Sequence, residues 1–170
     1  MAKVTGGDQF RRDLKRLEEQ TRGGVVRALD VASLEMLSEA DKHIPVDQGQ
    51  VRQQTGVRVD ASLLRAYLYS NAPHAPYVDL GTGSKAKIPP ELAEVAAQFR
   101  GSKGGSFADL LIAIQGWCKR KGIDVKAAYP IARSIARNGI SGSQFMYLGL
   151  QKGKAVFGQQ VGLLMKSVKV

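Results

Sequence analysis

The sequence predicts an α+β fold, in which a long N-terminal helix packs on a small antiparallel sheet, followed by a helical insertion and a C-terminal helix. Three observations predict it. Apolar residues recur at helical spacing before residue 45, alternate with polar ones between residues 57 and 70, and then return to helical spacing. At 170 residues the chain has the length of one domain. We therefore expect residues 1–170 to form a single domain, with residues 85–138 as a helical insertion within it.

Two helices are expected at the N-terminus. A first amphipathic helix over residues 9–22 would end near Gly23 and Gly24, because glycine commonly terminates helices. A second helix over residues 25–44 carries an apolar stripe, and Pro45 prevents it from continuing. The sequence therefore predicts a helical start that is interrupted by two adjacent glycines.

A β-hairpin is expected next. Residues 57–60 and 64–70 alternate apolar and polar side chains, as half-buried strands do, and residues 61–62 would connect them tightly. Residues 76–80 then read as a short extended or single-turn segment, which stops at a Gly-Thr-Gly sequence. In that turn, glycine permits a positive φ, and we expect Thr82 to form a local hydrogen bond.

The second half of the chain is expected to be mostly helical. Ser106 is a suitable N-cap for the middle helix of the insertion, and Gly122 is a suitable C-terminal residue for it. A third helix follows and stops at Gly139. Beyond the insertion, residues 145–148 read as a strand or extended segment, and residues 156–168 read as the closing helix.

Charge is distributed unevenly along the chain. Residues 1–84 contain 11 basic and 11 acidic side chains, whereas residues 85–170 contain 14 and 4, so the net charge of +10 lies in the second half. Such asymmetry indicates a surface that meets an anionic partner, either nucleic acid or an acidic protein. A basic face that only serves solubility is the competing interpretation.

The sequence offers no constellation of residues for catalysis or metal binding. His43 and His74 are far apart in sequence, and the single Cys118 cannot form an internal disulfide or a thiolate-rich metal site. The segment from Gly81 to Lys85 lacks the spacing of a phosphate-binding loop. We therefore expect no enzymatic activity, no metal and no cofactor. No apolar stretch approaches the roughly 20 residues that span a bilayer, so no membrane partner is expected.

One alternative function is a small basic DNA-binding protein. Two helices between Trp117 and Ile135, joined by a turn that contains glycine, could form a helix-turn-helix. The second helix offers few side chains for reading base edges, so phosphate contact is more compatible with it than sequence-specific recognition. The candidate contacts to DNA or to an acidic partner are Lys119, Arg120, Lys121, Lys126, Arg133 and Arg137.

Two short motifs give a more specific indication. The first resembles a Pro-x-Asp-x-Gly-x-Leu-Arg type pattern, with Val51 where Leu is usual. The second resembles a Tyr-x-x-x-x-Glu-Gly-Thr type pattern, with Asp79 in the acidic region one place off the usual spacing. The matching residues are Pro45, Asp47, Gly49 and Arg52 in the first motif, and Tyr77, Gly81 and Thr82 in the second. The order of helix, first motif, two strands and second motif resembles the neck proteins of long-tailed bacteriophages, also called head-tail joining or tail-completion proteins.

This resemblance implies a non-enzymatic virion protein. It would form a ring of identical copies in the phage neck, between the portal or adaptor proteins on the head side and the tail-terminator or tail-tube proteins. Assembly would take place in the host cytoplasm, and non-specific contact with the passing DNA is compatible with the role. The resemblance also implies that Asp47 and Arg52 hold their loop by hydrogen bonds or an ion pair, while Tyr77 packs beneath the turn at Gly81 and Thr82.

Overall fold

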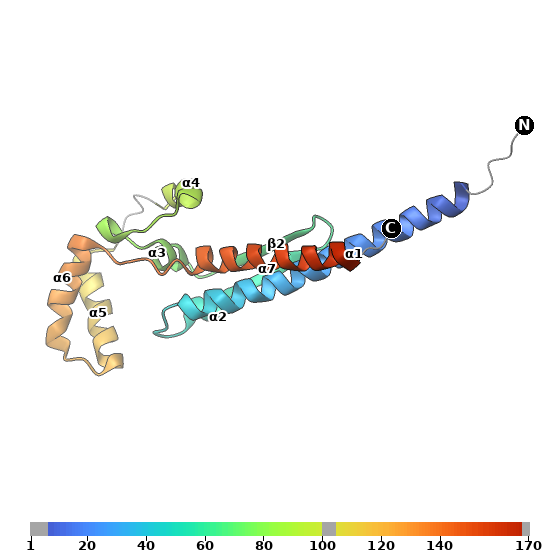
Figure 1. Cartoon of the computed structure of the whole chain (residues 1–170). Helices are drawn as coiled ribbons and strands as arrows, with labels where there is room; N and C mark the ends of the chain where they lie inside the picture. Colours follow the sequence, from blue (N-terminus) through green and yellow to red (C-terminus); the bar gives the residue numbers. More distant parts are fainter. Residues whose placement is uncertain (1–6, 100–104, 168–170) are drawn as a thin grey trace, which may run out of the picture. The chain divides into compact units, whose positions relative to one another are not determined.

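The computed structural model describes residues 7–99 and 105–167 (Figure 1). The predicted fold class is confirmed, because a long N-terminal helix, a two-stranded antiparallel sheet and a C-terminal helix are all present. The elements are α1 (Gly7–His43), α2 (Gln50–Gln53), β1 (Thr55–Asp60), β2 (Arg65–Ser70), α3 (Ala75–Leu80), the 3₁₀ turns η1 (Gly83–Lys85) and η2 (Pro90–Leu92), α4 (Ala93–Ala97), α5 (Phe107–Lys121), η3 (Val125–Ala127), α6 (Ala128–Asn138) and α7 (Phe145–Ser167).

The chain divides into two compact units. The first consists of residues 1–39, 56–69 and 148–170, and the second of residues 40–55 and 70–147. The predicted insertion lies wholly within the second unit. The single domain expected from the sequence stays a prediction.

In the first unit α7 packs against α1 (Figure 1), where Gly153 of α7 lies against Met36 of α1. Its buried apolar side chains among the described residues come from one face of α1 and from α7, and they are Ala28, Leu29, Ala32, Met36 and Val156. Arg22 on α1 reaches the hairpin turn, where its Nη2 donates to the carbonyl oxygens of Ala61 at 3.1 Å and Ser62 at 2.9 Å. A small helix-on-helix core and one helix-to-turn contact therefore define this unit.

The predicted break in the N-terminal helix is wrong, because α1 is continuous through both glycines. A Cβ atom placed on Gly24 would overlap the side chain of Leu164 on α7, whereas one on Gly23 would meet only Arg27 at 3.8 Å. Gly24 therefore permits the close approach of α7 and does not terminate α1. Helices accept glycine at a cost of about 1 kcal/mol when packing compensates.

The predicted hairpin is confirmed as β1 and β2, which pair with one another. Exposure alternates along β2, with Ala66 and Leu68 more buried than the neighbouring tyrosines, as the period-two pattern indicates. The connection is longer than expected and includes Leu64, whose φ is 51°. The Asp60 carboxylate accepts hydrogen bonds from the backbone N–H groups of Ser62 and Leu63, which fixes the turn.

The extended segment predicted at residues 145–148 is also wrong. These residues form the first turn of α7, and Phe145 is fully buried. The run Phe-Met-Tyr-Leu has strong β propensity, but its residues bury side chains on a helical face instead of alternating across a strand. Tertiary packing therefore overrides local propensity at the start of α7.

The second unit contains the helical insertion as expected. Ser106 caps α5 in a capping box with Asp109, and Gly122 ends the helix with a φ of 68°. Helices α5 and α6 pack side by side (Figure 1), and Cys118 of α5 and Ala128 and Ala132 of α6 are buried.

None of the helices within residues 7–99 and 105–167 is both long and apolar enough to cross a membrane.

Candidate functional site

The first motif forms the loop between α1 and α2. Gly49 adopts a φ of 77° and precedes the first residue of α2, a backbone conformation that favours glycine. Arg52 folds back on the end of α1, where its Nη2 donates to the carbonyl oxygen of Asp41 at 2.7 Å and its Nε lies 3.8 Å from the Asp41 carboxylate. Arg52 therefore anchors α2 to the preceding helix.

Asp47 in the same loop pairs with the insertion. Arg120 on α5 donates to the two oxygens of the Asp47 carboxylate, with Nη2 at 2.5 Å and Nε at 3.4 Å. The hydrogen bond from Arg120 lowers the pKa of Asp47, and the same bond raises the pKa of Arg120. Nearby, Nζ of Lys121 lies 3.4 Å from its acceptor, the carbonyl oxygen of Val46. The loop thus joins the end of α5.

Trp117 belongs to this junction. A cleft of about 450 Å³ is bordered by the first motif, by Val78 of α3, by Trp117 of α5 and by Ile140. The sequence placed Trp117 in a DNA-binding helix pair, but in the structure this side chain borders the motif loop. Residues from the first motif, from α3 and from the insertion therefore meet in one place.

The second motif closes against the segment that precedes α7. Thr82 forms two hydrogen bonds with Ile140, one from its N–H to the Ile140 carbonyl oxygen at 2.8 Å and one from the Ile140 N–H to Thr82 Oγ1 at 3.0 Å. The predicted local bond of Thr82 is therefore wrong, because its partner lies 58 residues away in sequence. Gly81 also pairs with Ser141 in an isolated antiparallel bridge.

Glycine residues allow the backbone at residues 81–82 to cross the backbone at residues 139–141 in direct contact. Gly81 has φ 79° and ψ −175°, and Gly139 has φ 77° and ψ −169°, a region of backbone space that is almost restricted to glycine. A Cβ atom on Gly139 would overlap the backbone of Thr82, and one on Gly81 would overlap the backbone around Ser141. Both positions allow two backbone segments to touch directly.

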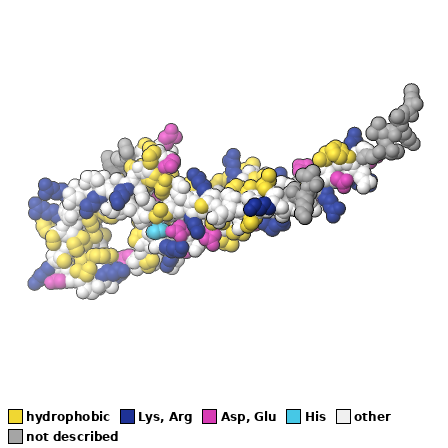
Figure 2. Space-filling model, in the orientation of Figure 1, with side chains coloured by type: hydrophobic (Ala, Val, Ile, Leu, Met, Phe, Trp, Pro, Cys, Tyr) yellow, Lys and Arg dark blue, Asp and Glu magenta, His cyan; other side chains and the backbone are white. Residues whose placement is uncertain are grey.

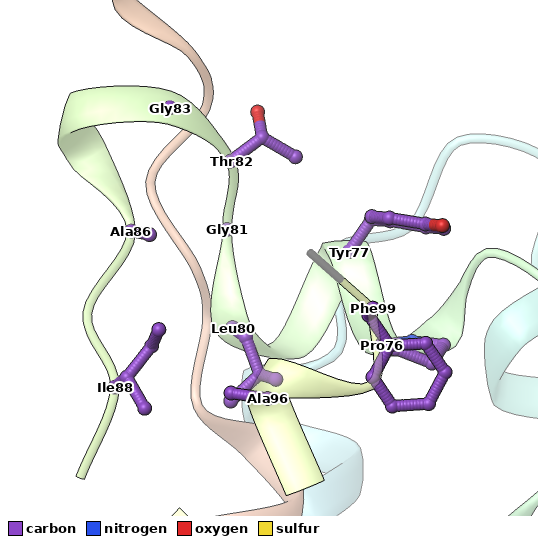
Figure 3. Close-up of a pocket in the computed structure, with 10 residues that line it drawn as sticks. All are labelled: Pro76, Tyr77, Leu80, Gly81, Thr82, Gly83, Ala86, Ile88, Ala96 and Phe99. Carbon is purple, nitrogen blue, oxygen red and sulfur yellow. The ribbon is translucent and has the colours of Figure 1, made fainter. Parts of the chain in front are cut away.

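Tyr77 lies beside this turn. It lines a cleft of about 470 Å³ together with Gly81, Thr82 and Phe99, and the side chains of α3 face α4 across it (Figure 3). The ring of Tyr77 meets that of Phe99 edge to face, with 6.4 Å between centroids and 73° between planes. The aromatic pair therefore connects the second motif to the end of α4.

Asp79 is the residue in this region whose importance sequence reasoning missed. The residue is 5% exposed, and its Oδ1 accepts a hydrogen bond of 2.8 Å from the backbone N–H of Met146, in the first turn of α7. Burial raises the pKa of Asp79, and the Met146 bond partly opposes that rise. The available signal was an acid inside the apolar run Pro-Tyr-Val-Asp-Leu, where a solvated charge is not expected.

The predicted contact residues for DNA divide into two groups. Arg120 and Lys121 bond to the first motif, as described above. The other side chains are exposed, and Figure 2 shows Lys and Arg gathered over the surface of α5 and α6. These exposed residues are Lys119, Lys126, Arg133 and Arg137. Two of the three basic residues after Trp117, Arg120 and Lys121, therefore make internal contacts, which weakens the helix-turn-helix interpretation.

Comparison with known families gives one match. The model of the HK97-gp10-like family, described as "Bacteriophage HK97-gp10, putative tail-component", matches residues 8–81. Comparisons with curated proteins and with solved structures gave no match. The matched segment runs from α1 through the first motif and the hairpin to Gly81, so it includes most of both motifs. It favours a phage tail component located in the virion over a DNA-binding protein. The resemblance to a phage structural protein is thus confirmed, and residues 8–81 of this chain match the HK97-gp10-like family of tail components.

Proposed function

We propose that this protein is a non-enzymatic component of the phage neck that forms a ring of identical copies and joins the head to the tail. The observation that carries the proposal is the family match, which spans the helix, both strands and the ordered motifs. Along its axis, the ring would contact portal or adaptor proteins on one side and tail-terminator or tail-tube proteins on the other.

The geometry of the motifs supports a scaffold. The polar side-chain atoms of Arg52, Asp47 and Thr82 form hydrogen bonds that join separate segments of the second unit. Over the part of the chain that the structure describes, there is no group of three or more His, Cys, Asp and Glu side chains that could hold a metal ion. Fixed corners of this kind suit a protein that works by assembly.

An apolar face on α1 supports assembly with other chains. Phe10 is 64% exposed and Leu14 is 49% exposed. A groove of about 750 Å³ runs beside Leu14 and Leu17 and is bordered by Leu64 of the hairpin turn. Apolar side chains that gather on an exposed surface mark interaction sites, so we expect another chain to cover the start of α1 around Phe10 and Leu14.

The exposed cations of α5 and α6 have two compatible roles in a neck. They could meet acidic surfaces of neighbouring proteins, or they could meet the phosphates of DNA that passes through the ring. Non-specific contacts of either kind weaken as salt concentration rises. We propose such contacts as secondary to assembly, since a conduit that bound DNA tightly would hinder its passage.

The proposal is tested by assembly of the purified protein with portal and tail proteins, followed by sedimentation and electron microscopy. We expect rings in the wild type, and we expect Leu14→Asp to reduce their yield at least about tenfold by placing a charge in an apolar interface. Leu34→Asp is the matched control, because Leu34 is 64% exposed on α1 but does not border the groove. A wild-type protein that stays monomeric with all neighbours present would contradict the proposal.

A further inference from the structure

Asp79 is a buried carboxyl group with few partners for a charge. The only hydrogen bond that its carboxylate receives from the described residues comes from the backbone N–H of Met146. No Lys, Arg or His of that part of the chain forms an ion pair with it, although 25 Lys and Arg residues are present. A buried carboxylate normally has a cation or several hydrogen-bond donors as partners. Asp79 has neither among the described residues.

A cavity of about 240 Å³ adjoins this carboxylate. Its walls are mostly apolar side chains from η2, α4 and the residues around α3, among them Leu80, Leu92, Val95 and Phe99. Asp79 supplies the only ionisable group among the residues that line the cavity. An apolar wall with a single carboxylate matches an aliphatic stem that ends in a cation. Lysine and arginine side chains have this chemistry.

We propose that the cavity beside Asp79 receives a lysine or arginine side chain from a second copy of this protein. The stem would pack against Leu92 and Val95, and the cationic end would pair with the Asp79 carboxylate. This inference rests on the proposed ring, in which each copy offers one surface to one neighbour and a different surface to the other. Every copy then accepts one cation and donates one.

Charge complementarity favours a second copy as the source of the cation. The chain carries an excess of ten basic over acidic side chains, and this excess lies in residues 85–170. Lys126, Arg133 and Arg137 are exposed on or next to α6 and have no ion-pair partner among the described residues. These three side chains are the first candidates for the donor.

The inference also gives a reason for keeping a carboxylate at this position. Because burial raises the pKa of Asp79, its protonated form favours folding. That contribution is complete below the unfolded-state pKa of about 3.9 and is lost as the pH rises through the folded-state pKa. At pH 7 the charged form therefore costs stability in the isolated chain. Pairing with a cation in the ring would offset this cost.

The first experiment replaces Asp79 and measures self-association by sedimentation equilibrium. Asp79→Asn retains an oxygen that can accept the Met146 bond but removes the charge. We expect self-association to weaken about tenfold or more, while the isolated variant is at least as stable as the wild type at pH 7. Asp30→Asn, which removes an exposed carboxylate on α1, is the control and should leave self-association unchanged. One of the substitutions Lys126→Gln, Arg133→Gln and Arg137→Gln should reproduce the loss at the donor position.

The second experiment tests the cavity directly with n-butylguanidinium chloride at millimolar concentration. We expect the Met146 amide resonance to shift on titration in the wild type and to stay unchanged in Asp79→Asn. Wild-type self-association in Asp79→Asn, or no shift with the probe, would overturn the inference while leaving the ring intact. Wild-type protein that stays monomeric with portal and tail proteins present would contradict the proposed function itself and would also exclude a second copy as the donor.

Discussion

Individual glycine residues decide whether the second motif can form. Gly139 passes so close to Thr82 that no side chain fits between the two backbones, and its dihedral angles belong to glycine alone. The sequence shows Gly139 only as the end of a helix. Its second role, as a crossing point with residues 81–82, depends on a partner that lies far away in the chain.

The first prediction concerns this crossing. Gly139→Ala should destabilise the protein by about 2–5 kcal/mol, because it combines backbone strain at positive φ with a displacement of Thr82. The measurement is the free energy of urea unfolding. Gly158→Ala is the control: this glycine is exposed within α7 with open space around it, so alanine should stabilise the protein by about 0.5–1 kcal/mol. Equal effects at the two sites would show that the crossing is not tight.

At the scale of the element, packing decides the length of the helices. Helix α1 continues through Gly24 because α7 lies against it there, and α7 begins at Phe145 because that side chain is buried. Local signals at both places indicate the opposite, since glycine pairs end helices and aromatic runs favour strands. By contrast, the N-cap at Ser106 and the stop at Gly122 were predicted correctly, because both act within a few residues of the helix end.

The two adjacent glycines of α1 provide a matched test of this explanation. Gly23→Ala should stabilise the protein by about 0.5–1 kcal/mol, because alanine has the higher helix propensity and meets only ordinary contacts. Gly24→Ala should destabilise it by about 1–3 kcal/mol, because the side chain of Leu164 must move. Thermal unfolding followed by circular dichroism measures both. If Gly24→Ala were also stabilising, close approach of α7 could not explain this glycine.

On the scale of the whole molecule, secondary-structure elements connect the two compact units. Helices α1 and α7 and strands β1 and β2 each contain residues of both units. Residues 40–43 of α1 and residues 145–147 of α7 belong to the second unit, so opening that unit would break backbone hydrogen bonds at these helix ends, and we expect the two units to unfold together. The single domain stays a prediction, and this continuity is the physical reason to expect it.

Cys118 offers a measurement of that cooperativity. Its thiol is fully buried within the second unit, so a disulfide reagent should not label it in the native protein. We expect labelling to begin at the same urea concentration at which the chain loses its helical circular dichroism, to which α1 and α7 contribute the largest number of residues. Labelling at a clearly lower urea concentration would show that the second unit opens by itself. The substitution Cys118→Ser, which removes the thiol, is the control for non-specific labelling.

The sequence by itself determined the fold class, the hairpin, the caps of the insertion and the resemblance to a phage structural protein. These features depend on hydrophobic periodicity and on turn chemistry, which act over a few residues. Tertiary structure decided the continuity of α1, the start of α7, the pairing of Asp47 with Arg120 and the burial of Asp79. Each of these depends on two segments that are distant in the sequence and adjacent in the fold. Local patterns do not specify which distant segments meet, and so the motifs were recognised before their partners were.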